Sequence, residues 1–141
     1  MADITGGCRC GAVRFRFSAP PLMTRVCWCR DCQYWASGNG TVNAVFRTDS
    51  LAEATGVTTE FVSRADSGNT MSRRFCPSCG TPLFSQGSAR PDIMVVRVGA
   101  LDDPEAARPS GTIWAASAPS WGHVDRDLPV TDGQPPAPPP L

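Results

Sequence analysis

The clearest hydrophobic pattern lies near the start of the chain, where Val13-Arg14-Phe15-Arg16-Phe17 alternates apolar and polar side chains. A period of two residues is typical of a strand with one buried face. Further short runs are rich in valine, phenylalanine and isoleucine and bounded by glycine, serine or asparagine, and they predict strands at residues 41–46, 60–63, 71–75 and 93–98. Helical periodicity is weak and predicts only single turns at residues 29–35 and 102–107.

These elements indicate a mainly β fold with little helix. The 141 residues suit one domain, and 13 glycines and 14 prolines favour short strands around a core small enough to benefit from bound metal. We assign this domain to residues 1–130. After it the composition changes to Thr131-Asp132-Gly133-Gln134-Pro135-Pro136-Ala137-Pro138-Pro139-Pro140-Leu141, which predicts a Pro-rich disordered tail over residues 131–141.

Charge and hydropathy exclude several classes of protein. Thirteen basic residues balance thirteen acidic ones, so the strongly basic surface of a nucleic-acid-binding protein is not expected. All the basic residues are arginines, which excludes Schiff-base chemistry on a lysine side chain. No apolar run is long enough to span a bilayer, and residues 1–7 lack the pattern of a signal peptide. We therefore expect a cytoplasmic protein with no membrane partner, while its oligomeric state cannot be read from the sequence.

All seven cysteines fall into three tight clusters, at residues 8–10, 27–32 and 76–79. In a reducing compartment such spacing indicates metal binding or catalysis rather than disulfides. Cys76-Pro77-Ser78-Cys79-Gly80 has the form of a zinc knuckle, in which a tight turn aims two sulfurs at one ion. Cys8 and Cys10 are the best source of its other two ligands, because the middle cluster already contains three.

Cys27, Cys29 and Cys32 then predict a second zinc site with three sulfurs and an open position, where water or a substrate thiol can bind. One alternative is a closed site, completed by His123 or Asp31, since zinc accepts both donor types. Another is a redox triad without metal. The expected cofactor is therefore Zn²⁺, two ions per chain, because all-thiolate sites favour zinc.

The residues around the clusters resemble the glutathione-dependent formaldehyde-activating enzyme family, which also includes centromere protein V. The resemblance spans residues 3–129. It is carried by Gly6-Gly7-Cys8-Arg9-Cys10-Gly11-Ala12-Val13-Arg14-Phe15, Cys29-Arg30-Asp31-Cys32-Gln33-Tyr34, Asp66-Ser67-Gly68-Asn69, Arg74-Phe75-Cys76-Pro77-Ser78-Cys79-Gly80-Thr81-Pro82-Leu83-Phe84, Gly99-Ala100-Leu101-Asp102-Asp103-Pro104 and Ile113-Trp114.

This resemblance implies a β-tent fold of short antiparallel sheets stapled by zinc. It also implies a structural zinc on Cys8, Cys10, Cys76 and Cys79, and a catalytic zinc on Cys27, Cys29 and Cys32. The implied activity is the condensation of glutathione with formaldehyde to S-hydroxymethylglutathione, which is classed with the carbon-sulfur lyases. The expected partners are a small thiol such as glutathione, and formaldehyde.

Two other functions remain open at this stage. A noncatalytic binding module would use zinc only for stability and would not need an open metal position. A thiol redox or metal-sensing protein would use Cys27, Cys29 and Cys32 without a permanent metal, and would form a disulfide within the triad under mild oxidation.

Overall fold

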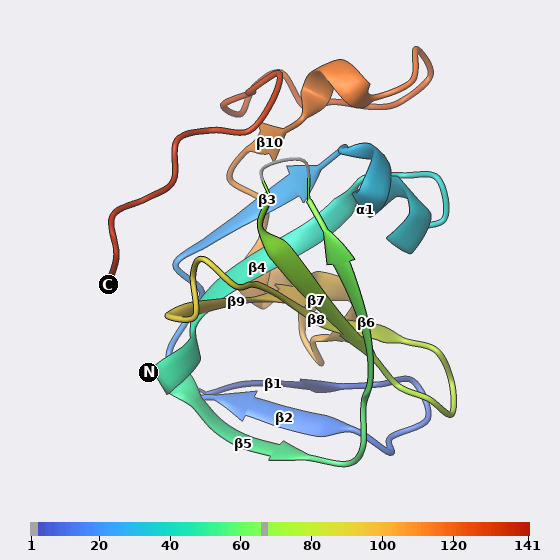
Figure 1. Ribbon diagram of the computed structural model, residues 1–141, viewed down its shortest axis with the longest axis vertical. Coiled ribbons are helices and arrows are strands. Elements are labelled where there is room, and N and C mark those ends of the chain that lie inside the picture. The colour runs from blue at the N-terminus through green and yellow to red at the C-terminus, as the bar shows by residue number, and fades with distance from the viewer. Residues whose placement is uncertain (1–2, 66–67) are drawn as a thin grey trace.

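The computed structural model describes residues 3–65 and 68–141, so Asp66 and Ser67 of the motif at residues 66–69 lie outside the described part of the chain. The described residues form two sheets, one short α-helix and several 3₁₀ turns (Figure 1). The strands are β1 (Ile4–Gly7), β2 (Arg14–Phe17), β3 (Met23–Cys27), β4 (Thr41–Arg47), β5 (Leu51–Thr55), β6 (Thr59–Arg64), β7 (Thr70–Phe75), β8 (Pro82–Gly87), β9 (Ile93–Arg97) and β10 (Thr112–Ile113). The helix is α1 (Arg30–Trp35), and the 3₁₀ turns are Thr48–Ser50, Val98–Ala100, Pro104–Ala107 and Ala115–Ser117.

The mainly β prediction is confirmed, and each of the five predicted strands is present to within a residue or two at its ends. The turn predicted at residues 29–35 is α1, whereas the turn predicted at residues 102–107 is a 3₁₀ turn at Pro104–Ala107. In the described residues no helix is long and apolar enough to cross a membrane.

The small sheet has the order β1-β2-β5, and the large sheet has the order β10-β3-β4-β9-β8-β7-β6. All pairs are antiparallel except β10 with β3. Figure 1 shows the small sheet at the bottom of the view and α1 with the C-terminal segment at the top. The two sheets are joined at their lower edge, where β4 leads through Thr48–Ser50 into β5.

The core fills the space between the sheets. Alternation in β2 turns Phe15 and Phe17 inward, where both are buried. Phe17 stacks on Phe46 of β4 with ring centroids 4.1 Å apart, and Phe15 packs edge-on against Phe84 of β8 at 5.1 Å. These contacts use one face of the large sheet. The cross-strand pairs of Val96 with Ala44 and with Phe84 lie on that same face.

The opposite face of the large sheet carries polar residues among apolar ones such as Val45 and Val95, because the alternate residues of the same strands point there. Asn43 of β4 pairs with Arg97 of β9, and Arg73 of β7 pairs with Ser85 of β8. At the upper end of this face, Thr41 pairs with Cys27, the last residue of β3. A small apolar core therefore stabilises one side of the sheet, and the other side is available for chemistry.

Residues 111–134 cross the outer edge of the large sheet. Thr112 bridges Val130, and the amides of Trp114 and Ala115 donate to the carbonyls of Gly133 and Thr131. These hydrogen bonds span the boundary proposed between residues 130 and 131. The disorder of residues 131–141 stays a prediction.

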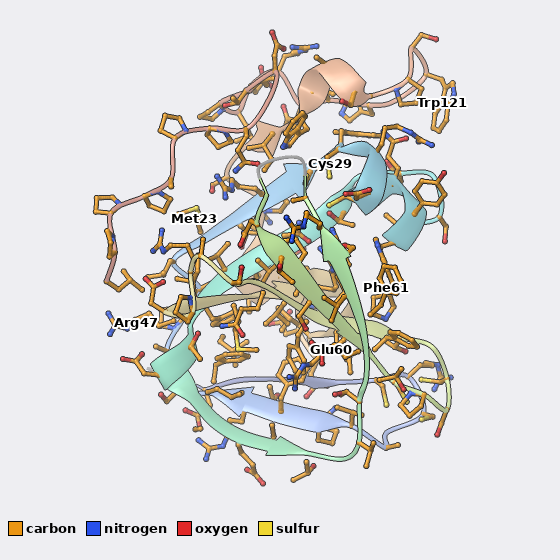
Figure 2. All side chains as sticks on the ribbon, in the orientation of Figure 1. Met23, Cys29, Arg47, Glu60, Phe61 and Trp121 are labelled. Atoms are coloured by element: carbon orange, nitrogen blue, oxygen red, sulfur yellow. The ribbon has the colours of Figure 1, made fainter. Side chains whose placement is uncertain are left out.

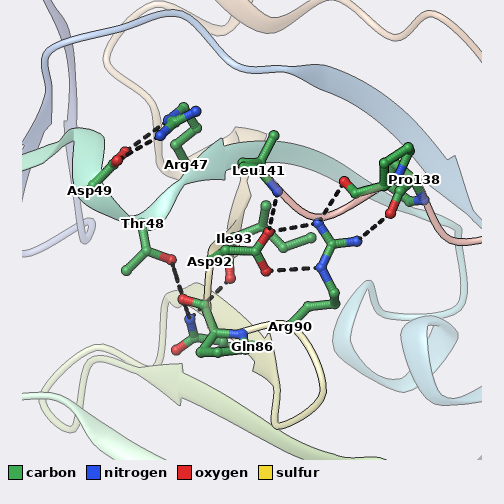
Figure 3. A network of polar contacts seen from close by, with 11 residues as sticks. Arg47, Thr48, Asp49, Gln86, Arg90, Asp92, Ile93, Pro138 and Leu141 are labelled. Carbon is green, nitrogen blue, oxygen red and sulfur yellow. Dashed lines mark hydrogen bonds and ion pairs between the residues drawn. The ribbon is translucent and has the colours of Figure 1, made fainter.

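The end of the chain lies beside the β8–β9 loop, as Figure 3 shows. Arg90 forms an ion pair of 2.7 Å with Asp92 and donates to the carbonyl of Pro138 at 2.8 Å. The amide of Leu141 donates to Asp92 at 3.2 Å.

Candidate metal centres

The first cysteine group forms where two hairpin loops meet. Residues 8–13 connect β1 to β2, and residues 76–81 connect β7 to β8. The sulfurs of Cys8, Cys10, Cys76 and Cys79 all lie within 4.8 Å of one another. The Cys8–Cys10 distance is 3.5 Å and the Cys10–Cys76 distance is 3.8 Å. The pairing of the first cluster with the last, which was inferred from spacing, matches this geometry.

Local backbone conformation aims these sulfurs at a common point. Gly11 and Gly80 have φ values of 82° and 76°, which glycine adopts without the strain that a side chain would bring. The amide of Val13 donates to Cys8 Sγ at 3.2 Å, and the amide of Ser78 donates to Cys76 Sγ at 3.4 Å. Although burial raises the pKa of Cys8, hydrogen bonds lower it overall, the largest of them from the Val13 amide, which stabilises the negative charge of the thiolate.

The Thr81 hydroxyl lies 3.2 Å from Cys79 Sγ. This contact, together with backbone hydrogen bonds, lowers the pKa of Cys79 to about 5. At neutral pH the group therefore carries at least one thiolate, which is the form of cysteine that binds metals.

The second cysteine group lies at the junction of β3 and α1, where Figure 2 labels Cys29. Cys27 ends the strand, Cys29 is the N-cap of the helix, and Cys32 lies in its first turn. The Cys29 sulfur accepts the amide of Cys32 at 3.3 Å, as a capping side chain does. The three sulfurs lie within 4.8 Å of one another, and Cys27 and Cys32 are buried.

Within the described residues no carboxylate or imidazole joins this triad. His123 and Asp31, which the sequence left open as fourth ligands, are both exposed and lie outside the group. The closed-site alternative is therefore not formed here, because the loop that carries His123 does not bring its ring to the triad. Among the described residues the protein itself therefore supplies three donors to this group.

Thr41 and Arg97 supply a polar environment on the strand side of the triad. The pKa of Cys32 is well below its ordinary value because the thiols of Cys27 and Cys29 donate hydrogen bonds to it, with smaller contributions from Thr41 and Arg97. Hydrogen bonding with Cys29 in turn raises the pKa of Cys27. Hydrogen bonding among the three sulfurs thus favours the thiolate at Cys32. Neither Thr41 nor Arg97 has a sequence pattern that could have identified it.

Trp28, between the first two triad cysteines, is almost fully buried. Its ring packs against Gly40 and Gly122, where an added Cβ would lie 3.2 Å and 3.0 Å from indole atoms. Its Nε1 has no hydrogen-bond partner. This residue therefore packs between Gly40 and Gly122, whereas Trp114 packs against the triad, Trp121 is exposed and Trp35 lines a cavity.

A cavity of about 250 Å³ lies near this centre. Its wall includes Thr41 and Arg97, both of which interact with Cys32, so these two residues connect the cavity to the triad. Trp35 from α1 forms the wall on the helix side. The remaining lining comes from the C-cap of α1, the starts of β4 and β8 and the 3₁₀ turn after β9: Ala36, Gly40, Val42, Pro82, Gly99 and Ala100.

Comparison with known proteins adds three findings. Residues 3–117 match the family model described as glutathione-dependent formaldehyde-activating enzyme. A Halomonas elongata protein, provisionally named a glutathione-dependent formaldehyde-activating enzyme, is 27% identical over 128 residues, which cover 86% of this chain and 81% of that protein. A crystal structure of a Rhodobacter sphaeroides protein superposes with a TM-score of 0.53 at 24% identity, covering 70% of this chain and 87% of that one. The last of these is a likeness of fold.

Proposed function

The chain belongs to the glutathione-dependent formaldehyde-activating enzyme family, and from that premise we propose that it is a zinc-dependent enzyme of the carbon-sulfur lyase type. It acts on a small thiol adduct, in the manner of S-(hydroxymethyl)glutathione synthase, with glutathione and formaldehyde as the reference substrates. The observation that carries this proposal is the three-sulfur group, which has no fourth ligand among the described residues and shares its neighbours Thr41 and Arg97 with the wall of a cavity.

The four-sulfur group fits zinc, and the three sulfurs of the triad, within 4.8 Å of one another, are close enough to share an ion. Zinc–sulfur bonds of about 2.3 Å in a tetrahedron place the sulfurs about 3.8 Å apart. The distances of 3.5 Å and 3.8 Å in the four-sulfur group agree with that geometry. We assign Cys8, Cys10, Cys76 and Cys79 to a structural zinc, and Cys27, Cys29 and Cys32 to a reactive one.

A bound zinc ion keeps a coordinated substrate thiol deprotonated at neutral pH. In the forward reaction the thiol sulfur forms a bond to the carbon of formaldehyde, the π electrons of the carbonyl move to its oxygen, and that oxygen takes a proton. The product is the S-hydroxymethyl hemithioacetal, in which the proton lost from the thiol is balanced by the proton gained at oxygen, and the lyase direction reverses each change. The triad fixes where the sulfur lies, and the buried Arg97 guanidinium offsets the negative charge that three thiolates leave there.

A thiol redox or metal-sensing function is the second candidate, and it is favoured by a different observation. Cys32 is stabilised as a thiolate with two further sulfurs within 4.8 Å, which suits disulfide formation. Mild oxidation separates the two functions: zinc-loaded enzyme resists it, whereas a redox triad forms a disulfide between two of its three cysteines.

The test of the proposed enzyme is adduct formation followed by NMR with ¹³C-formaldehyde and glutathione. We expect the zinc-loaded protein to accelerate formation of the S-hydroxymethyl carbon, and Cys32→Ala to abolish both the acceleration and thiol binding. Asp31→Asn is the matched control, since this exposed neighbour lies outside the sulfur group. Thiol binding and turnover that persist undiminished in Cys32→Ala would refute the proposal.

A further inference from the structure

Two arginines are buried on the face of the large sheet that lies opposite the core. Arg73 of β7 is 7% exposed and Arg97 of β9 is 9% exposed. The strand register places both arginines on the same face as Cys27. Cys27 pairs with Thr41 of β4, and Arg97 pairs with Asn43, two residues further along that strand. Arg73 lies two strands away from Arg97, across Ser85. Arginine is almost never buried without a charged partner.

Neither guanidinium has a carboxylate partner among the described residues. The ion pairs found there involve other arginines, namely Arg14, Arg16, Arg47, Arg90 and Arg108. Arg97 donates to the amide oxygen of Asn43, and Arg73 donates to the Ser63 hydroxyl at 2.8 Å. Arg73 Nε is buried without any acceptor. Burying a charge with only neutral partners is costly, and that cost falls when an anion binds.

The triad provides a negative charge for only one of these arginines. Three thiolates around a divalent ion carry a net charge of minus one, and Arg97 interacts with the sulfurs of Cys32 and Cys27. Arg73 instead lies over the ring of Trp35, with its guanidinium carbon 5.8 Å from the ring centroid. Because Trp35 and Arg97 both line the cavity beside the triad, the uncompensated charge of Arg73 lies near its wall.

We propose that Arg73 and Arg97, beside the ring of Trp35, form the subsite that binds a carboxylate of the thiol substrate. This inference rests on the proposed function, because it assumes that the sulfur of the same molecule binds at the triad. A guanidinium suits this task since it pairs with both oxygens of a carboxylate and stacks on an aromatic ring. The cavity volume of about 250 Å³ equals that of about eight water molecules, which suits one arm of a small molecule.

The test measures calorimetric affinities of the zinc-loaded protein for two small thiols. Mercaptopropionate carries a carboxylate, and mercaptoethanol carries a hydroxyl in a similar position. We expect mercaptopropionate to bind about tenfold to a hundredfold more tightly, as one charge-assisted interaction provides. Arg73→Met should remove this preference, and Arg73→Lys should restore part of it. Arg74→Met is the matched control, because Arg74 is the exposed neighbour on the other face of β7 and should leave the preference intact.

A melting curve of the ligand-free protein separates binding from structure. If the role of Arg73 is to bind a ligand, the melting temperature of Arg73→Met should be no lower than that of wild type, because the substitution removes a buried charge that lacks a carboxylate partner. A lower melting temperature together with an unchanged preference would give Arg73 a structural role and overturn the proposal. Equal binding of both thiols to the wild-type protein would overturn it as well, while leaving the thiol site standing.

If neither thiol binds, the proposed function fails and succinate decides the subsite. Succinate carries carboxylates and no sulfur, so its binding does not depend on the triad. Succinate binding that is lost in Arg73→Met would support the subsite alone. Absence of succinate binding in that case would refute both claims.

Discussion

Replacing Cys76 by alanine tests whether the four-sulfur group holds the fold together. Cys76 is fully buried, and its sulfur lies 3.8 Å from that of Cys10 across 66 positions of the chain. A cross-link that closes a loop of this length contributes about 4 kcal/mol through the entropy of the unfolded chain, whereas the short loop from Cys27 to Cys32 contributes only about 2 kcal/mol. Metal coordination adds to the stabilisation that comes from closing the longer loop, since zinc contributes about 10 to 16 kcal/mol in small zinc-binding peptides.

A domain of this size has a total stability of about 5 to 15 kcal/mol. We therefore expect Cys76→Ala to be unfolded, or to lose at least about 4 kcal/mol, because the buried ligand is lost and only Cys79 is left to tie the β7–β8 loop to Cys8 and Cys10. Cys32→Ala should lose about 2 kcal/mol or less and remain folded. The measurement is urea unfolding in zinc-containing buffer, followed by tryptophan fluorescence.

Ser78→Ala is the control for this experiment. Ser78 is exposed in the same loop, and its contact with Cys76 Sγ comes from the backbone amide, which alanine retains. The reasoning is refuted if Cys76→Ala unfolds at the wild-type urea concentration, or if it loses no more stability than Cys32→Ala does.

Three further predictions concern the fold and its charges. Phe46→Ala should cost about 3 to 5 kcal/mol in urea unfolding, because it empties a fully buried position stacked on Phe17; a loss below 1 kcal/mol would contradict this. Gly6→Ala should lower stability by at least about 1 kcal/mol, since its Cβ would lie 2.4 Å from the carbonyl oxygen of Ala100, whereas Gly99→Ala, with no atom within 4 Å, should not. The Arg14 guanidinium lowers the pKa of Asp102 to about 2 from 3.8, so its stabilising effect is present above about pH 4 and is lost as the pH falls through 2. Asp102→Asn should therefore be less stable than wild type by under about 1 kcal/mol at pH 7, and this difference should vanish by pH 2 in urea titrations.

Sequence patterns predicted those strands whose side chains alternate or are rich in branched residues. They did not predict β5, because four of its five residues are exposed and no buried face marks it. β1 was not predicted because it ends in Gly6-Gly7, a pair that is typical of turns. In the structure a side chain at Gly6 would collide with Ala100 and Phe15. The glycine there is a consequence of close packing, which no local pattern reveals.

The division of seven cysteines into four and three could be predicted, because each cluster is compact in sequence and the two clusters of two cysteines together supply the four ligands of one site. Their role as metal ligands stays a prediction. The residues around the triad could not be found in this way. Thr41 and Arg97 come from different strands and meet Cys32 only through the register of the large sheet. Arg73 is marked only by its burial, and Arg74 beside it has the same sequence character.

The central claim is that the triad holds a zinc ion of its own, separate from the structural one. It is tested most directly by counting zinc ions per folded chain in the wild-type protein and in Cys32→Ala, purified without added metal or chelator. The account predicts two ions in the wild type and one in the variant. One ion in both proteins would contradict it and would favour the redox function for Cys27, Cys29 and Cys32.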